Sequence, residues 1–199
     1  LGIPGAIAGG AATLWVYTRR TGMATGSWLD IFAISIPLGQ AIGRVGCFLV
    51  GDDYGGPTDL PWGVAFPEGL PPSTAGNLAA FGVTVPAGVD PSTVLAVHPT
   101  QLYETLLMFL AFTVLWKLRL KDWGTGALLG VYLIMAGAER FFVEILRAKD
   151  DRFFAGFTAA QLTSVAILVV GVMLFTRLRG AGQVPAGEYL SLTPAKSVK

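Results

Sequence analysis

The chain has 199 residues, of which 53% are hydrophobic and 14% charged, and its formal net charge is +1. Soluble domains usually carry about 25% charged residues, so this composition argues against an ordinary soluble protein and predicts a membrane protein. The near-zero charge gives no basic surface for a nucleic-acid partner, and a single cysteine and a single histidine exclude an internal disulfide and give no basis for a metal or another cofactor.

Five stretches are apolar enough to predict transmembrane helices, since a helix needs about 20 residues to cross the hydrocarbon core. They are residues 1–18, 28–50, 100–116, 126–146 and 158–175. The first begins without Met or a signal-peptide pattern, and we expect the chain to start inside a longer protein. The predicted fold class is all-α: a polytopic helical membrane protein whose single transmembrane domain covers residues 1–179.

Residues 51–97 separate the second and third spans and are rich in Gly and Pro, which break helices. We expect one long loop here and no second folded domain. Lys and Arg follow the first, third and fifth spans, and cytoplasmic segments retain such residues. This pattern predicts that the loop is extracytoplasmic and that residues 180–199 form a disordered cytoplasmic tail.

The second span carries Arg44 about two turns before its end, where an ionisable group costs about 2.5 to 3.5 kcal/mol and needs a partner or a polar cavity. Asp52 and Asp53 follow at the mouth of the span. Three glycines at helical spacing predict a close approach of another helix, and they are Gly39, Gly43 and Gly46. An arginine that extends to the headgroups beside a packing face would explain the pattern equally well.

The third span begins with His98-Pro-Thr-Gln-Leu-Tyr-Glu. Gln101 and Glu104 lie on one helical face at i, i+3. Glu104 would also suit the positive end of the helix dipole, and His98 would more often be a capping or interfacial residue than a base. The cluster adds polar groups at the level of Arg44.

The fourth span ends with Arg140, Glu144 and Arg147, which form one stripe at i, i+4 and i+7. Two arginines that share one glutamate leave surplus positive charge, and guanidinium groups bind phosphate through paired hydrogen bonds. An internally neutralised structural network is equally compatible with these residues. Together, three polar clusters at one membrane face predict a site for a lipid headgroup.

Four motifs, in this order, resemble those of the phosphatidylglycerol:prolipoprotein diacylglyceryl transferase family of bacteria. They are GRVGCFLVG at 43–51 with Tyr54-Gly55 following, PWGVAFP at 61–67, HPTQLYE at 98–104 and RFFVEILR at 140–147. The resemblance implies a multi-pass protein of the bacterial inner membrane with seven spans, of which the first two would precede this chain. It also implies an active site toward the extracytoplasmic face.

The activity implied by the resemblance is transfer of the diacylglyceryl group of phosphatidylglycerol to the lipobox cysteine of a prolipoprotein signal peptide. The transfer forms a thioether and releases glycerol phosphate. The partners would be phosphatidylglycerol, the prolipoprotein and other membrane lipids.

The site roles are carried over from the matching motifs. Arg44 and Arg140 match essential arginines of the family and would hold the phosphate, while Glu144 would orient Arg140 and Arg147 would make a secondary contact. The remaining substrate-binding residues would line or brace the cavity, and they are Asp52, Gly55, Gln101, Tyr103 and Glu104. Asp52 stands where many members have Glu.

One departure concerns the base. Aligning Gly5-Ala-Ile-Ala-Gly-Gly with a family motif places Pro4 where the histidine proposed as base usually stands. His98 and Glu144 are then the candidate bases, or the chain is a non-catalytic relative that binds or translocates lipid. Cys47 replaces a frequent Asn, and we expect it to be structural because the substrate supplies the thiol. A small transporter would also carry buried charges, but no internal repeat supports that reading.

Overall fold

The computed structural model describes residues 2–22, 25–147, 152–154 and 157–181. Its long helices are α1 (Gly2–Thr21), α2 (Thr25–Val50), α4 (Thr100–Leu118), α5 (Ala127–Leu146) and α6 (Ala159–Leu178). Each corresponds to one predicted span, which confirms the all-α class. Of the predicted tail, only residues 180 and 181 belong to the described part of the chain.

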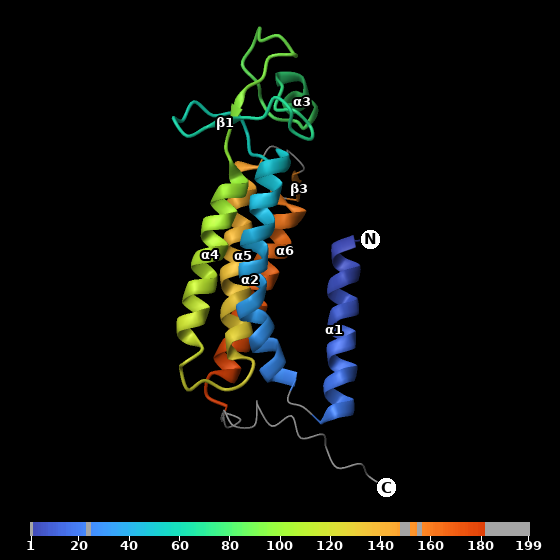
Figure 1. Ribbon diagram of the computed structural model, residues 1–199, viewed down its shortest axis with the longest axis vertical. Coiled ribbons are helices and arrows are strands. Elements are labelled where there is room, and N and C mark those ends of the chain that lie inside the picture. Colours follow the sequence, from blue (N-terminus) through green and yellow to red (C-terminus); the bar gives the residue numbers. More distant parts are fainter. Residues whose placement is uncertain (1, 23–24, 148–151, 155–156, 182–199) are drawn as a thin grey trace.

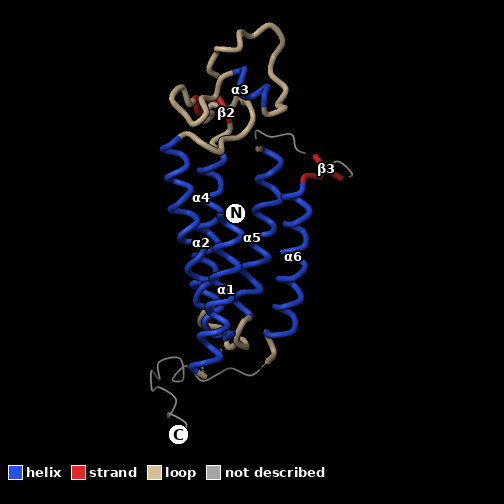
Figure 2. The backbone as a smooth tube through the Cα atoms, turned by 90° about the vertical axis from the view of Figure 1, so that its right-hand side faces the viewer, coloured by secondary structure: helices blue, strands red, loops and turns tan. Residues whose placement is uncertain are grey.

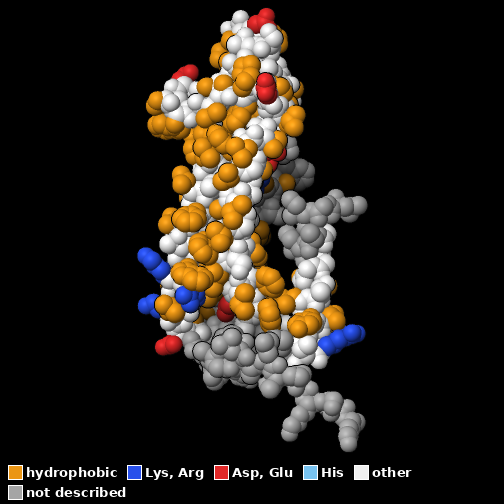
Figure 3. Space-filling model, viewed as in Figure 1, with side chains coloured by type: hydrophobic (Ala, Val, Ile, Leu, Met, Phe, Trp, Pro, Cys, Tyr) orange, Lys and Arg blue, Asp and Glu red, His pale blue; other side chains and the backbone are white. Residues whose placement is uncertain are grey.

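Three helices in the described part, α2, α4 and α6, are long and apolar enough to cross a membrane by length and composition. Large apolar side chains cover the outside of the bundle along its length (Figure 3). Because such a surface is stable only in contact with lipid or another protein, it supports the membrane assignment. α1 and α5 have 20 residues each, and membrane crossing by these two remains a prediction.

Helices α2, α4, α5 and α6 run along the long axis of the bundle (Figures 1 and 2), and α1 stands apart from them in Figure 1. The contact between α1 and α2 lies near their connection, where the hydroxyl groups of Thr18 and Thr25 are 2.8 Å apart. Successive long helices alternate in direction, as the predicted spans require.

Helices α5 and α6 approach closely through glycines. A Cβ at Gly171 would lie 2.8 Å from the carbonyl oxygen of Gly130, and one at Gly137 would lie 2.7 Å from that of Ser164. Small residues at such a seam allow two backbones to pack directly, which is the main way that helices associate in lipid.

The predicted close approach on the glycine face of α2 is wrong. A Cβ at any of the three glycines would meet no described atom within 4 Å; these are Gly39, Gly43 and Gly46. Helix α2 instead buries a different small-residue face, at Ala33, Pro37 and Ala41. The spacing of the glycines does not by itself show which face of the helix packs against its neighbours.

Residues 51–97, called the cap below, cover one end of the bundle (Figure 2). They contain β1 (Val64–Ala65), α3 (Ala75–Ala80) and β2 (Ala96–Val97), and β1 pairs antiparallel with β2. The cap therefore has more structure than the predicted loop, including one short helix.

The cap has an apolar cluster of its own, made of Tyr54, Phe66, Leu78 and Val97. Phe48 of α2 contacts Phe66 edge to face, with ring centroids 5.6 Å apart. This contact anchors the cap to the end of α2 and fixes the segment between them.

The opposite end of the bundle carries the basic clusters that follow α1, α4 and α6 (Figure 3). An arginine in each cluster lies over an aromatic ring, and the shortest distance is 3.9 Å from Arg119 to the Trp116 centroid. Aromatic and basic residues gather where a membrane meets water. The second sheet, β3 (Arg152–Phe154) with β4 (Phe157–Thr158), joins α5 to α6 at the cap end.

Candidate active site

The end of α2, the start of α4 and the end of α5 meet under the cap, and each contributes charged groups. Arg44 of α2 pairs with Glu104 of α4, with Nε 2.5 Å from Oε2. Arg44 also donates through Nη1 to Oδ2 of Asp53, at 3.0 Å. The intramembrane arginine thus has two carboxylate partners and does not simply extend into the headgroups.

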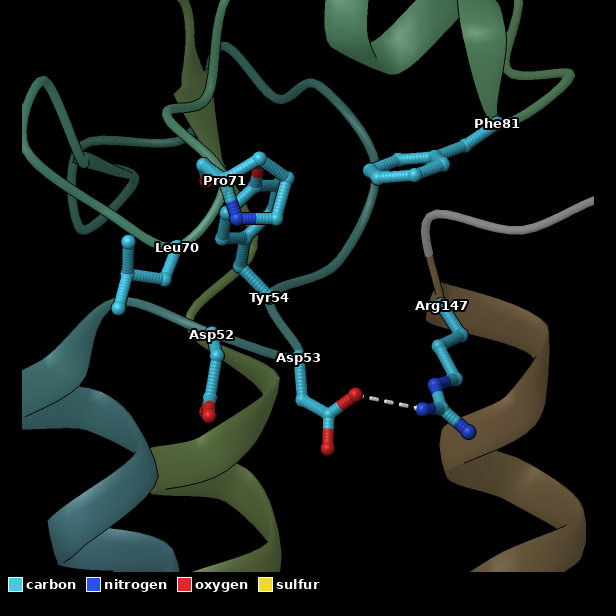
Figure 4. Close-up of a pocket in the computed structure, with 7 residues that line it drawn as sticks. All are labelled: Asp52, Asp53, Tyr54, Leu70, Pro71, Phe81 and Arg147. Carbon is cyan, nitrogen blue, oxygen red and sulfur yellow. Dashed lines mark hydrogen bonds and ion pairs between the residues drawn. The ribbon is translucent and has the colours of Figure 1, made fainter.

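Asp53 continues the network to α5. Its Oδ1 accepts from Nη2 of Arg147 at 2.7 Å (Figure 4). Glu144 lies 3.8 Å from Arg147 and 2.6 Å from Arg140, measured between charged atoms. The prediction that Glu144 can serve both arginines is confirmed.

The predicted surplus of positive charge is wrong for this arrangement. Three arginines, Arg44, Arg140 and Arg147, are balanced by three carboxylates, Asp53, Glu104 and Glu144. The sequence pattern considered α5 alone, whereas two of the acids come from α4 and from the segment after α2.

The three carboxylates differ in exposure. The side chains of Glu144 and Glu104 are 3% and 9% exposed, and that of Asp53 is 42% exposed. Glu144 also accepts a hydrogen bond from the hydroxyl of Thr158, at 3.3 Å. The two glutamates therefore form the closed side of the site and Asp53 its open side.

Arg140 has an unused donor. Its Nη1 is buried and has no hydrogen-bond partner among the described residues, although Nη2 of the same group is paired with Glu144. A buried polar group without a partner costs about 1 to 3 kcal/mol. An anionic ligand oxygen would supply the missing acceptor.

Asp53 is ionised at neutral pH. Burial by itself would raise the pKa of its carboxyl, but the charges and hydrogen bonds of Arg147 and Arg44 outweigh it and leave the pKa below the usual range. The sequence prediction placed Asp52 in the substrate site and left Asp53 out.

The start of α4 fixes the backbone on which Asp53 stands. Thr100 donates to the carbonyl oxygen of Asp53 at 2.8 Å, and the fully buried Gln101 donates to that of Asp52 at 2.5 Å. Asp53 has a φ of 55°, an uncommon left-handed conformation for a residue with a side chain. Gln101 therefore holds the backbone of Asp52, and its predicted role in lining or bracing a substrate cavity stays a prediction.

Gly55 lies where three chain segments meet. A Cβ there would be 2.5 Å from the carbonyl oxygen of Leu146 and 2.8 Å from side-chain atoms of His98 and Thr100. Gly55 forms an isolated bridge with Arg147, and its N–H donates to the carbonyl oxygen of His98 at 2.8 Å. Only glycine allows this contact, which ties the cap to α5.

His98 and Tyr103 belong to a neighbouring cluster. Nδ1 of His98 is 3.4 Å from the hydroxyl of Tyr103, and that hydroxyl accepts from the indole N–H of Trp62 at 2.8 Å. In the described part of the chain, the hydrogen bonds of the His98 ring do not reach the arginines. Pro4 aligns with the family histidine that is proposed as the base, and its side chain lies outside the described residues.

A pocket of about 230 Å³ opens beside the network. Its lining residues come from the cap and from the C-terminal end of α5. They are Asp52, Asp53, Tyr54, Leu70, Pro71, Phe81 and Arg147 (Figure 4). The pocket has apolar walls and a charged side, a combination suited to an amphiphilic ligand.

Ligand atoms of Cys47, Asp52 and Asp53 lie within 4.8 Å of one another. Two guanidinium groups already pair with Asp53, however, and their charges oppose a cation at this position. A cation is therefore disfavoured beside Asp53.

The fold and the site define a class: a helical membrane protein with a site of arginines and carboxylates at one end of its bundle, beneath a cap. The profile of the prolipoprotein diacylglyceryl transferase family matches residues 1–177. The chain therefore belongs to this family.

Individual relatives agree with the family match. The chain is 35% identical over 178 residues to the phosphatidylglycerol–prolipoprotein diacylglyceryl transferase of Solidesulfovibrio magneticus. It is 33% identical over 174 residues to that of Clostridium tetani and 36% identical over 177 residues to that of Finegoldia magna. The matches cover 87% of this chain and 59%, 62% and 60% of these relatives. The chain thus spans about three fifths of the length of the curated relatives that it matches.

Proposed function

We propose that the protein is a diacylglyceryl transferase that uses phosphatidylglycerol as donor and the lipobox cysteine of a prolipoprotein as acceptor. The observation that supports this most strongly is the meeting of Arg44 from α2 with Arg140 and Arg147 from α5 in one network beneath the cap. The names of the relatives supply the two substrates.

The chemistry requires positive charge at the phosphate. The substrate sulfur attacks the glyceryl carbon that carries the phosphate ester, the carbon–oxygen bond breaks, and the bond electrons leave with glycerol phosphate. Guanidinium groups stabilise that leaving anion, and more strongly where water is scarce. Arg44 and Arg140 would bind the phosphate, with Nη1 of Arg140 offering a donor that has no hydrogen-bond partner among the described residues.

Glu144 is better suited to hold the arginines than to act as the base. Its carboxylate already contacts Arg140, Arg147 and Thr158, so a substrate thiol would compete with charged partners for its oxygens. We assign it the role of orienting Arg140.

His98 is the better candidate for the base. Its backbone lies beside Gly55, which bridges to Arg147, so His98 stands at the level of the site. We expect His98→Gln to lower the transfer rate by about 10²-fold or more, as for loss of a general base. The pH dependence of the transfer rate should also change, because a general base acts only in its unprotonated form. An unchanged pH profile would remove His98 from this role.

The membrane setting is part of the proposal. We infer a multi-pass protein of the bacterial cytoplasmic (inner) membrane with the site toward the extracytoplasmic face. Support comes from the basic clusters at the end of the bundle opposite the cap, since basic residues are retained on the cytoplasmic side.

The test is a transfer assay with the purified protein in liposomes. Phosphatidylglycerol and a synthetic lipobox peptide are supplied, and the peptide mass is measured. We expect a peptide heavier by one diacylglyceryl group, and none with a peptide whose cysteine is replaced by serine. Lipid binding without any adduct would instead identify a non-catalytic lipid-binding relative.

A further inference from the structure

The carboxylate of Asp53 occupies the position of an anion between two arginines. Each of its oxygens takes one guanidinium group: Oδ2 is 3.0 Å from Nη1 of Arg44, and Oδ1 is 2.7 Å from Nη2 of Arg147. A phosphodiester also presents two unesterified oxygens on one central atom. Asp53 and a lipid phosphate that binds Arg44, with Arg147 as its secondary contact, would therefore compete for the same donors.

Asp53 is the carboxylate of the network that can leave most easily. Its side chain is 42% exposed, whereas those of Glu104 and Glu144 are 9% and 3% exposed. It forms part of the pocket wall and points across the pocket toward Arg147 (Figure 4). A rotation of the side chain alone would free Nη1 of Arg44 and Nη2 of Arg147.

The backbone of Asp53 is held independently of these ion pairs. Thr100 donates to its carbonyl oxygen at 2.8 Å, and Gln101 holds the preceding carbonyl. Asp53 also has a left-handed backbone conformation, with a φ of 55°, in the segment that these two hydrogen bonds hold. Displacing the carboxylate therefore does not require the cap to move.

We propose that Asp53 is an internal competitor: its carboxylate pairs with Arg44 and Arg147, and the phosphate ester of the substrate lipid displaces it. The identity of that lipid rests on the proposed function, and the displacement rests on the geometry. Asp53 is then a specificity-determining residue, because a ligand without an anionic oxygen pair cannot replace it.

The consequence is a measurable reduction in affinity. If the arginines are free of Asp53 for about 10 to 30% of the time, the apparent dissociation constant is about 3- to 10-fold higher than without the competitor. Removing the carboxylate should tighten the binding of an anionic lipid by that factor.

The experiment compares the full chain with Asp53→Asn and Asp53→Gly. Glycine accepts the left-handed conformation and keeps the backbone path if the asparagine variant does not fold. Dihexanoyl phosphatidylglycerol and glycerol phosphate are titrated separately in a non-ionic detergent, with calorimetry as readout. Asp59→Asn, which removes an exposed carboxyl of the cap, is the matched control.

We expect the folded Asp53 variants to bind the lipid about 3- to 10-fold more tightly and the Asp59 variant to bind as the wild type does. A gain with the lipid alone would assign the competition to the headgroup in its membrane lipid, and a gain that includes glycerol phosphate would assign it to the phosphate ester itself. Unchanged or weaker binding of both ligands would overturn the inference and make Asp53 a brace.

The inference and the proposed function can fail separately, because the titration needs no peptide and no turnover. Tighter binding by the variants together with no transfer by the wild type would support the displacement of Asp53 and contradict the transferase activity. Transfer by the wild type without tighter lipid binding by the variants would support the transferase activity and contradict the displacement of Asp53.

Discussion

Asp53 and Gly55 lie two residues apart and show how much of the site depends on single positions after α2. Asp53 joins two helices through its charge, and Gly55 joins the cap to α5 by having no side chain. Each makes a prediction that can be checked without a substrate.

Asp53 should make stability depend on acid pH. Its pKa in the folded protein lies below the usual range because of Arg147 and Arg44, despite partial burial. The stabilisation is therefore complete above the unfolded value of about 3.9 and is lost as the pH falls through the folded value.

The measurement is the midpoint of thermal unfolding in detergent between pH 7 and pH 3, for the wild type and Asp53→Asn. Other carboxyls titrate in both proteins, so the difference isolates Asp53. The two curves should converge toward pH 3, and parallel curves would show that the ion pairs add no stability.

Gly55→Ala should disturb the site. The added methyl would lie 2.5 Å from the Leu146 carbonyl oxygen and 2.8 Å from atoms of His98 and Thr100, and overpacking of this kind costs about 1 to 3 kcal/mol. Gly39→Ala is the matched control, because a methyl there meets no described atom within 4 Å. The free energy of unfolding in mixed micelles should fall for the first variant only; equal effects would contradict the contact.

At the scale of the elements, the N-terminus of α5 is capped by a side chain of another helix. The residue before the helix, Gly126, is its N-cap and has no side chain to cap it. Asp30 of α2 accepts instead from the N–H groups of Gly126 at 2.7 Å and Leu129 at 3.1 Å. A carboxylate at a helix N-terminus also interacts favourably with the positive end of the helix dipole.

Asp30→Ala should therefore destabilise the bundle by about 1 kcal/mol, the usual cost of losing an N-cap, and Asp30→Asn by less because the amide oxygen still accepts. Unfolding in mixed micelles measures both variants. A loss for Asn as large as that for Ala would mean that the charge of Asp30 matters more than its hydrogen bonds.

The long helices were predictable from the sequence because the thickness of the bilayer fixes the length of an apolar run. Which face of a helix packs was not: the glycines of α2 are exposed, while the seam forms at Gly130 and Gly171. Nor was the pairing of Arg44 with Glu104, because it depends on the distance between two helices 60 residues apart in the chain.

Within the site, the motif residues Arg44, Arg140, Glu144 and Arg147 were predictable because ionisable groups in apolar spans are costly and stand out. Asp53 was missed in favour of Asp52. The two are adjacent acids, and only the left-handed turn at Asp53 directs its carboxylate at the arginines. A turn of that kind leaves no clear signal in residue type.

At the scale of the whole molecule, the basic clusters and the cap lie at opposite ends of the bundle. We expect Ala87→Cys in the cap to react with an impermeant maleimide in spheroplasts, and Leu120→Cys, 75% exposed at the other end, to react only after permeabilisation. The background is Cys47→Ser, which removes the single thiol of the chain. The opposite labelling pattern would show that the cap lies on the cytoplasmic side and would contradict the inferred orientation.

The central claim is that guanidinium groups from separate helices hold one lipid phosphate beneath the cap. It is tested most directly by the kcat/KM of diacylglyceryl transfer in Arg44→Ala and Arg140→Ala, with Arg179→Ala at the far end of the bundle as control. Loss of a preorganised donor to the leaving anion predicts a fall of about 10²-fold or more for each of the first two and no change for the control. Wild-type transfer by either folded Arg44 or Arg140 variant would contradict the claim.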